Sequence, residues 1–331
     1  MSSRQAPFGD FMKVLTVGPN DAGQRLDKFL TKTLKHLPMS MLYKGIRTKK
    51  IKVNRKRAEI SQMLAVGDTI ELFLPPDILE EEAAPAPFTK LTPRLDIVYE
   101  DEHILLLNKR AGLIVHSDAE EDTNTLISHV QAYLYRKGEY DPAAEQSFAP
   151  ALVNRIDRNT GGIVIAAKTA EALRVLNQKV RDRELEKNYL CAAHGIFEKK
   201  EGLLTGWLTK DSDKNQVTVY EKRPRDPSAR MIKTGYRVLK EKNGLSLLEI
   251  DLLTGRTHQI RAHLASVGHP LLGDGKYGVN REDKAKGYKF QALYSWALTF
   301  RFTTDAGALD YLNGKRFEVD KQQIWFLEEF Q

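Results

Sequence analysis

The segment NRIDRNTGG, residues 154–162, lies between two apolar stretches that are predicted to be strands. It places one carboxylate, Asp157, between Arg155 and Arg158, and it ends in Thr-Gly-Gly. Two nearby cations favour an ionised carboxylate, and glycines allow a bulky substrate to approach the backbone closely. Taken alone, a structural salt bridge in a turn explains the segment better than a functional site does. The other motifs of the chain reverse that preference.

Around this loop, the chain from Arg94 onward combines many short strands with occasional helices. The strands are predicted at 96–99, 104–108, 163–167, 189–193, 235–239 and 245–253. The helices are predicted at 125–135, from Thr169 to Val180 and from Thr257 to Val267. This irregular mixture favours an α+β domain over a parallel α/β sheet.

The second candidate group lies in KNYLC at 187–191, where Tyr189 and Cys191 alternate onto one face of a predicted strand. A single Tyr on a strand is usually a core residue. A free Cys on an apolar strand is usually inert. Tyr189 therefore becomes a platform for a stacked ring only if it points toward the loop of Asp157.

The third group is LTGRTHQIRAH at 253–263, followed by GHPLLGDGKYG at 268–278. Arg261 lies about 100° around the predicted helix from Ile260, so it can reach an anion across the domain. The buried face of this helix is expected to consist of Ile260, Leu264 and Val267. No metal site is expected, because the segment has neither a Cys partner nor HExxH spacing for its His258, His263 and His269.

The basic charge is concentrated in the first quarter of the chain. The 331 residues carry a net charge of +7. Residues 1–76 hold 14 Lys and Arg against 6 Asp and Glu, so this part alone has a net charge of +8. A concentrated basic block indicates an anionic partner, most commonly nucleic acid. The densest part of the block is formed by Arg47, Lys49, Lys50, Lys52, Arg55, Lys56 and Arg57.

The same quarter of the chain predicts two helices at 25–37 and 41–47, a strand at 51–53, a turn at Asn54 and a closing strand at 69–74. Its segments RLDKFL, IKVNRKR and VGDTIEL resemble the small RNA-binding module named after ribosomal small-subunit protein four. The resemblance implies fixed cations that hold phosphates, with salt-sensitive affinity and little reading of base sequence.

Composition sets the expected domain boundaries. Residues 77–93 are rich in Pro and Glu and are expected to be an extended linker. We therefore expect a tail at 1–13, the basic module at 14–76, this linker, and a second domain at 94–331. No apolar run approaches the roughly 20 residues of a membrane span. A single Cys and the lack of a secretory signal pattern indicate a cytoplasmic protein.

Taken together, the three groups resemble the RluA-type pseudouridine synthases, and the N-terminal module is similar to that of the RluC and RluD branch. The resemblance implies a pseudouridine synthase fold, α+β with a mixed, largely antiparallel central sheet flanked by helices, behind a small α+β RNA-binding domain. It also implies that Asp157 is the catalytic carboxylate, that Tyr189 stacks on the target base, and that Arg261, not Arg256, pairs with Asp157. RNA contacts are expected from Arg155, Arg158, Thr160, Arg256 and His258, in addition to the seven cations of the module.

The sequence departs from the family pattern at several positions. Within the loop, Asn154 replaces His, Ile156 replaces Leu and Gly161 replaces Ser. Elsewhere, Lys109-Arg110 replaces Lys-Pro, and Tyr294 stands where His is usual. None of these changes removes the carboxylate, the tyrosine or the arginine.

The implied reaction breaks a carbon–nitrogen glycosidic bond, rotates uracil and forms a carbon–carbon bond. It involves neither redox change nor net hydrolysis, so no cofactor and no metal are expected. Two routes are open to Asp157, as a nucleophile at the sugar or as a base at the neighbouring carbon. A hydrolytic glycosidase would need a second carboxylate to activate water, and none stands out beside Asp157.

Three alternatives compete with this interpretation. Cys191 could add to uracil as a thiolate, the chain could be a catalytically silent RNA-binding factor of ribosome assembly, or it could be a glycosidase that releases uracil. The expected partner is RNA, with large-subunit ribosomal RNA ahead of transfer RNA. We expect a monomer that needs neither a membrane nor an obligate protein partner.

Overall fold

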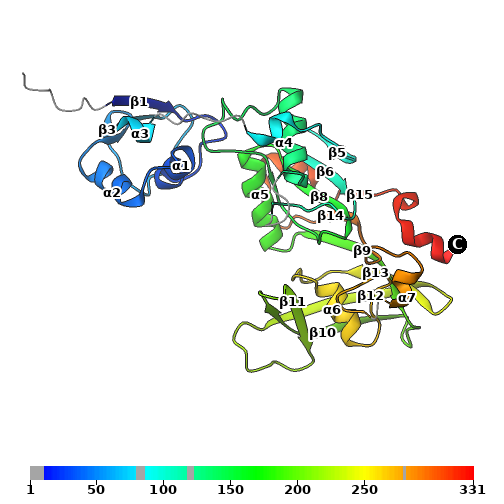
Figure 1. Ribbon diagram of the computed structural model, residues 1–331. Coiled ribbons are helices and arrows are strands. Elements are labelled where there is room, and N and C mark those ends of the chain that lie inside the picture. Colours follow the sequence, from blue (N-terminus) through cyan, green and yellow to red (C-terminus); the bar gives the residue numbers. More distant parts are fainter. Residues whose placement is uncertain (1–10, 80–85, 118–122, 279–280) are drawn as a thin grey trace, which may run out of the picture. The chain divides into compact units, whose positions relative to one another are not determined.

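The computed structural model describes residues 11–79, 86–117, 123–278 and 281–331 (Figure 1). The chain divides into two compact units. One unit comprises the chain up to Leu91 together with residues 131–150 and 169–171. The other comprises 92–130, 151–168 and 172–331. None of the helices in these described ranges is both long and apolar enough to cross a membrane.

The N-terminal module is a four-stranded sheet with two helices. The strands are β1 (Phe11–Thr16), β2 (Ile51–Val53), β3 (Lys56–Arg57) and β4 (Thr69–Leu74), in the antiparallel order β1-β4-β2-β3. The helices are α1 (Leu26–Thr33) and α2 (Met39–Arg47). Alternate residues of β4 are buried, and they pack with Phe29, Leu30 and Leu42 of the helices in one apolar core.

Three features of the module differ from the prediction. β1 begins at Phe11, inside the expected tail, and pairs along the whole of β4. Helix α1 ends at Thr33, although Leu34 and Leu37 beyond it remain buried. Helix α3 (Pro76–Leu79) and the short 3-10 helix η1 (Pro87–Lys90) lie where an extended linker was expected. Ile78 and Leu79 pack into the module core. Burial of two large apolar side chains is favourable enough to order this segment despite the neighbouring prolines.

The second unit is built on an 11-stranded sheet. Its main order is β11-β10-β12-β13-β9-β14-β8-β6-β5, with β15 paired to β14 and β7 paired to β8. Every pairing is antiparallel except that of β14 with β8. The strands are β5 (Ile97–Glu100), β6 (Ile104–Lys109), β7 (Ala151–Leu152), β8 (Gly161–Ala167), β9 (Leu185–His194), β10 (Glu201–Asp211), β11 (Gln216–Tyr220), β12 (Arg230–Lys242), β13 (Leu245–Asp251), β14 (Leu293–Phe300) and β15 (Arg316–Glu318).

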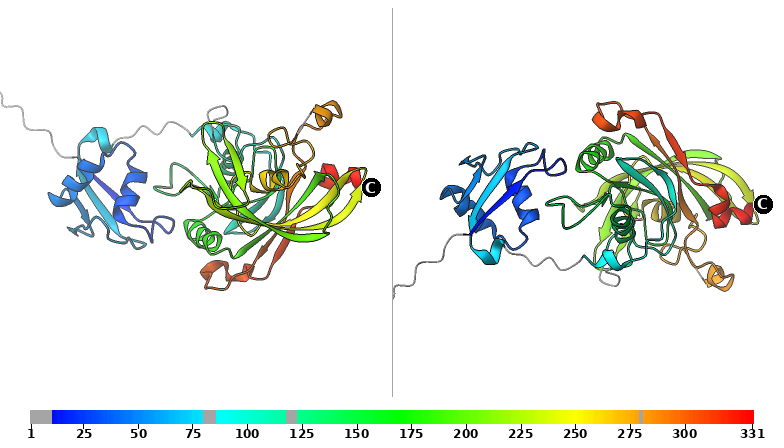
Figure 2. Two further views of the ribbon diagram at one scale, coloured as in Figure 1. Left: turned by 90° about the horizontal axis from the view of Figure 1, so that it is seen from below. Right: turned by 90° about the horizontal axis from the view of Figure 1, so that it is seen from above.

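Helices and 3-10 segments flank this sheet. Helix α6 (Gln259–Ser266) packs against β10, β11 and β12 (Figure 1). The long strands β10, β12 and β13 curve, as the two views of Figure 2 show. The remaining elements are α4 (Leu126–Lys137), α5 (Ala170–Arg181), α7 (Arg281–Ala285), η2 (Gly307–Leu312), η3 (Lys321–Gln323) and η4 (Trp325–Phe330).

The α+β class and the largely antiparallel sheet are as predicted, but the centre of the sheet was missed. β14, LYSWALTF, is buried along its whole length and lies between β9 and β8. A strand buried on both faces shows no polar alternation, so its sequence gives no period-2 signal. β10 and β11 were also not predicted, because β10 exposes alternate residues with no clear apolar face.

Gly162 gives a prediction about the stability of this sheet. Its φ is +115°, and a Cβ built on it would lie 2.2 Å from the carbonyl oxygen of Ser295 on β14. Gly162→Ala should therefore lower the free energy of unfolding by about 3 kcal/mol, through both strain and overlap with backbone. Gly244→Ala is the matched control, since Gly244 has φ +75° but nothing within 4 Å. It should cost about 1 kcal/mol. Equal losses in denaturant unfolding would show that the close approach to β14 does not matter.

Candidate active site

Three segments that are distant in sequence line one cavity of about 320 Å³. The loop 153–160 before β8 contributes one side, and Lys187 and Tyr189 of β9 contribute another. Residues 252–261, which lead from β13 into α6, contribute a third, and Val180 of α5 and Leu293 of β14 add apolar surface. The three sequence motifs therefore meet at one place, which their separate patterns could only suggest.

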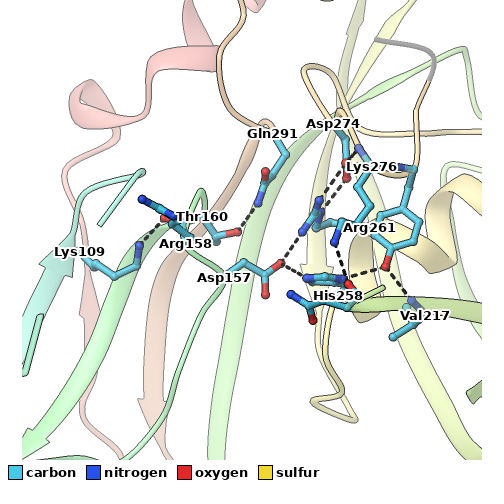
Figure 3. Close-up of polar contacts among 12 residues, drawn as sticks. Lys109, Asp157, Arg158, Thr160, Val217, His258, Arg261, Asp274, Lys276 and Gln291 are labelled. Carbon is cyan, nitrogen blue, oxygen red and sulfur yellow. Dashed lines mark hydrogen bonds and ion pairs between the residues drawn. The ribbon is translucent and has the colours of Figure 1, made fainter. Parts of the chain in front are cut away.

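Asp157 and Arg261 are in direct contact, as Figure 3 shows. Nη1 of Arg261 donates a hydrogen bond to Oδ2 of Asp157 at 2.9 Å. The Asp157 side chain is 25% exposed, whereas that of Arg261 is only 8% exposed. Within the described part of the chain, no hydrogen bond to Oδ1 of Asp157 is present. That oxygen is thus left available to a molecule in the cavity.

A second carboxylate, Asp274, fixes the guanidinium of Arg261. Nε and Nη2 of Arg261 donate to the two oxygens of Asp274 at 2.8 and 2.9 Å, and the Asp274 side chain is fully buried. Burial alone would lower the pKa of Arg261, but the hydrogen bonds and charge of Asp274, with the charge of Asp157, raise it. Burial works to raise the pKa of Asp274, yet Arg261 and the backbone N–H groups of Lys276 and Tyr277 lower it overall. Arg261 therefore stays protonated, and its guanidinium is held in one orientation toward Asp157.

His258 lies at the start of α6 with a defined tautomer. The backbone N–H of Val217 donates to the hydroxyl oxygen of Tyr277 at 3.0 Å, and that hydroxyl lies 2.8 Å from Nδ1 of His258. Burial lowers the pKa of His258 to about 4, so the ring is neutral at pH 7. The Tyr277 proton then goes to Nδ1, which leaves the proton of the ring on Nε2. Nε2 lies 3.9 Å from Oδ2 of Asp157.

Tyr189 forms an apolar wall of the cavity. It is only 6% exposed, and it lies opposite Ser295 of β14 in the sheet register. Burial, together with the charge of Asp157, raises the pKa of Tyr189 to about 12, so the phenol keeps its proton at neutral pH. Tyr189 and Asp157 therefore line the same cavity, which the strand position alone did not establish.

Lys109, at the end of β6, fastens the loop that carries Asp157. Its buried ammonium group donates to three backbone carbonyls, those of Arg110, Leu113 and Arg158, at 3.1, 2.7 and 2.9 Å. Burial lowers the pKa of Lys109 to about 7, and the charge of Asp157 partly offsets this. The loop is held from its other end by a buried hydrogen bond at 3.1 Å, from Gln291 to the hydroxyl of Thr160 (Figure 3).

Only some of the residues predicted to contact RNA line the cavity. Arg155 and Arg256 line the rim of the cavity with exposed side chains, and His258 and Thr160 lie within it. The cation in contact with Asp157 is Arg261, whereas Nε of the exposed Arg158 points to the carbonyl of Gly112 at 3.4 Å. That Arg155 and Arg158 keep Asp157 ionised stays a prediction. The cations at 47–57 belong to the other compact unit.

Helix α6 corrects a further expectation. Ile260 and Leu264 are buried as predicted, but Val267 is 45% exposed because the helix ends at Ser266. Arg261 and His263 are buried instead. Each has a partner that offsets the cost of burial: Arg261 has its carboxylates, and Nδ1 of His263 lies 2.9 Å from the hydroxyl of Thr234.

Sequence reasoning missed Asp274, Tyr277, Lys109 and Gln291 as parts of the site. Asp274 and Tyr277 lie in GHPLLGDGKYG, so the motif was found but not the roles of these side chains.

Among the described residues, no group of three His, Cys, Asp or Glu side chains is gathered closely enough to hold a metal ion. Cys191 is completely buried, and burial raises the pKa of its thiol, which disfavours the thiolate that a nucleophile requires.

Gly161 and Tyr294, two residues that depart from the family pattern, pack against each other. A Cβ added to Gly161 would lie 2.4 Å from Cε2 of Tyr294, so the Tyr ring fills the space that a larger residue at 161 would need. The hydroxyl of Tyr294 donates to Oδ1 of Asn108 at 2.6 Å, inside the core. Gly161 and Tyr294 thus form a matched pair behind the loop of Asp157.

This pairing predicts a non-additive pair of substitutions. Gly161→Ser should destabilise the protein by about 1–3 kcal/mol, because the new side chain overlaps the Tyr294 ring. In Gly161→Ser combined with Tyr294→His, the loss should be clearly smaller than the sum of the two single losses. Urea unfolding of the wild type, both single variants and the double variant measures the coupling. Strictly additive losses would mean that the two positions are independent.

Comparison with known proteins places the chain. The sequence pattern of the family described as RNA pseudouridylate synthase matches residues 103–266. The ribosomal large subunit pseudouridine synthase C of Vibrio vulnificus is 32% identical over 89% of this chain and 90% of its own length. The protein of that name from Escherichia coli K12 is 31% identical over 88% of this chain and 89% of its own length.

Solved structures agree at the level of the fold. Human RNA Pseudouridylate Synthase Domain Containing 1 matches with a TM-score of 0.51 and 19% identity, over 74% of this chain and 97% of its own. The human Domain Containing 4 protein matches with a TM-score of 0.52 and 21% identity, over 68% and 87%. The chain thus shares the fold of these two proteins, whose names describe RNA pseudouridylate synthase domains. The chain belongs to the RNA pseudouridylate synthase family, as its motifs predicted.

Proposed function

We propose that this enzyme converts uridine to pseudouridine in folded large-subunit ribosomal RNA, with Asp157 as the reacting carboxylate. The contact between Asp157 and Arg261 in a cavity that also contains Tyr189 carries the proposal. The names of the bacterial relatives supply the substrate class. We place the activity in the cytoplasm, where such RNA is found. We also propose that it acts as a monomer.

In this proposal the RNA presents one uridine that has left its stack, at a cost of a few kcal/mol. The ring lies against Tyr189, and the sugar faces Oδ1 of Asp157. The carboxylate then attacks the sugar, or removes a proton from the neighbouring carbon, while the bond to N1 of uracil breaks. The ring rotates and C5 bonds to the sugar, which releases the carboxylate on the first route; on the second route the abstracted proton returns to the neighbouring carbon. The proton lost from C5 is balanced by one gained at N1. Product and substrate are isomers, so nothing is consumed.

Arg261 acts in this scheme by holding Asp157 rather than by touching the RNA. Three of its five N–H groups already donate to Asp157 and Asp274. Because Asp274 fixes the guanidinium, the carboxylate of Asp157 is oriented before substrate arrives, and little reorganisation is needed during the reaction. The neutral His258 presents Nε2–H beside Asp157, where it can donate to an oxygen of the bound nucleotide.

Asp157→Asn tests the catalytic assignment. The change keeps the size of the side chain but removes its charge, so pseudouridine formation should fall by about 10³-fold or more. Cys191→Ala should keep the wild-type rate. The measurement is pseudouridine mapping in ribosomal RNA from cells that lack the protein and carry each variant. A modified site that returns with Asp157→Asn, or is lost with Cys191→Ala, would overturn the assignment. Release of free uracil would instead indicate a glycosidase.

Asp274→Asn tests the clamp on Arg261. This variant leaves the side chains of Arg261 and Asp157 unchanged but removes the charge that orients the guanidinium. We expect kcat to fall by about 10- to 100-fold, with KM nearly unchanged, because misplacement affects the reaction more than RNA binding. Steady-state kinetics on an RNA fragment containing the mapped uridine would measure this split. A variant with wild-type kcat would show that Asp157 needs no such positioning.

A further inference from the structure

A groove on the N-terminal module has the composition of a nucleotide site. It encloses about 530 Å³ between helix α2 and the segment that follows β3. Ile46 and Ala58 form its buried floor, with 8% and 2% of their surfaces exposed. Its walls are lined by Tyr43, Arg47, Arg57 and Glu59. An apolar floor between polar walls suits a flat ring that carries charge at its edge.

Tyr43 is exposed without a structural reason. Its relative exposure of 54% exceeds that of the other exposed tyrosines, Tyr135, Tyr220 and Tyr311, which are 39–40% exposed. In the described part of the chain, the Tyr43 ring has neither an aromatic neighbour nor a hydrogen bond. Tyr135 and Tyr311, in contrast, each have a ring partner. A free aromatic face at a groove is available to stack on another ring.

The two arginines beside Tyr43 also lack ion-pair partners among the described residues. Arg47 lies one helical turn beyond Tyr43, so both side chains project from the same face of α2. Arg57 lies opposite, on β3. Within the described ranges, neither guanidinium has an ion pair or a side-chain hydrogen bond, whereas Arg55 lies 3.7 Å from Glu71. Glu59 is the one acidic residue of the lining, so the groove keeps an excess of positive charge.

We propose that this groove binds one unpaired nucleotide of the RNA, with its base stacked on Tyr43 and its flanking phosphates held by Arg47 and Arg57. The proposal rests on the RNA substrate proposed above and adds a base-stacking contact to a module expected to hold phosphates alone. Stacking on an aromatic ring is tolerant of base identity, because every base has a π-face. Guanidinium groups suit phosphate through two parallel hydrogen bonds. An apolar peptide would leave both cations unmatched.

The test uses the full-length protein and two RNA hairpins with the same stem, one blunt and one with a short single-stranded uridine extension. Tyr43→Ala should weaken binding of the extended hairpin about tenfold and leave the blunt hairpin unchanged. Tyr43→Phe should bind both as the wild type does, since the ring is retained. Tyr311→Ala is the matched control for loss of an exposed tyrosine, and it should bind both normally.

Salt dependence separates stacking from charge. Tyr43→Ala should keep the wild-type slope of log affinity against log salt concentration. Arg47→Gln and Arg57→Gln should each reduce the slope by about one. The proposal fails if Tyr43→Ala binds the extended hairpin like the wild type, or weakens both hairpins equally. It also fails if Tyr43→Phe is as weak as Tyr43→Ala.

A further comparison separates this proposal from the proposed function. Wild-type protein that forms pseudouridine while Tyr43→Ala binds normally would refute the groove alone. Wild-type protein that binds RNA with the expected stacking but forms no pseudouridine would refute the activity alone. With both proposals correct, Tyr43→Ala loses affinity for the extended hairpin, while Asp157→Asn keeps the preference for the extended over the blunt hairpin and forms no product.

Discussion

One guanidinium shared between two carboxylates is the interaction on which the site depends. Arg261 makes two hydrogen bonds to a fully buried Asp274 and one to a partly exposed Asp157. Breaking a buried pair of this kind by removing one partner typically costs about 3–5 kcal/mol. Asp274 pairs with the buried side of the guanidinium through Nε and Nη2. Nη1 can therefore orient a second carboxylate, Asp157, which reaches the cavity. The same guanidinium therefore stabilises the fold through Asp274 and, in the proposed reaction, orients Asp157.

The sheet determines where these groups meet. β8 follows directly from the loop of Asp157, β9 carries Tyr189, and β14 lies between the two strands. Gly162 allows β14 to approach β8 closely, and Gly161 makes room for the ring of Tyr294. Lys109 and Gln291 then fix the loop through its carbonyls and through Thr160. A loop constrained at both ends can hold a reactive carboxylate in one place, which a mobile loop would not do.

The departures from the family pattern become intelligible once packing is considered. Replacement of Ser by Gly at 161 and of His by Tyr at 294 looked like two unrelated changes in the sequence. In the structure they occupy one shared space, and the Tyr hydroxyl satisfies a buried hydrogen bond with Asn108. Changes of this kind alter the support of the loop while leaving Asp157, Tyr189 and Arg261 in place. They bear on stability more than on the reaction.

The sequence by itself determined the α+β class, the basic module, the family and the three residues that meet in the cavity, because these depend on local patterns and recognisable motifs. It did not reveal β14, since a strand buried on both faces has no alternation to detect. Nor did it reveal that Asp274 anchors Arg261, that the tautomer of His258 is set through Tyr277, or that Tyr43 borders a groove with two unpaired arginines. Those features are contacts between segments far apart in the chain or between facing surfaces, and only the folded backbone brings such atoms within hydrogen-bonding distance or leaves them exposed.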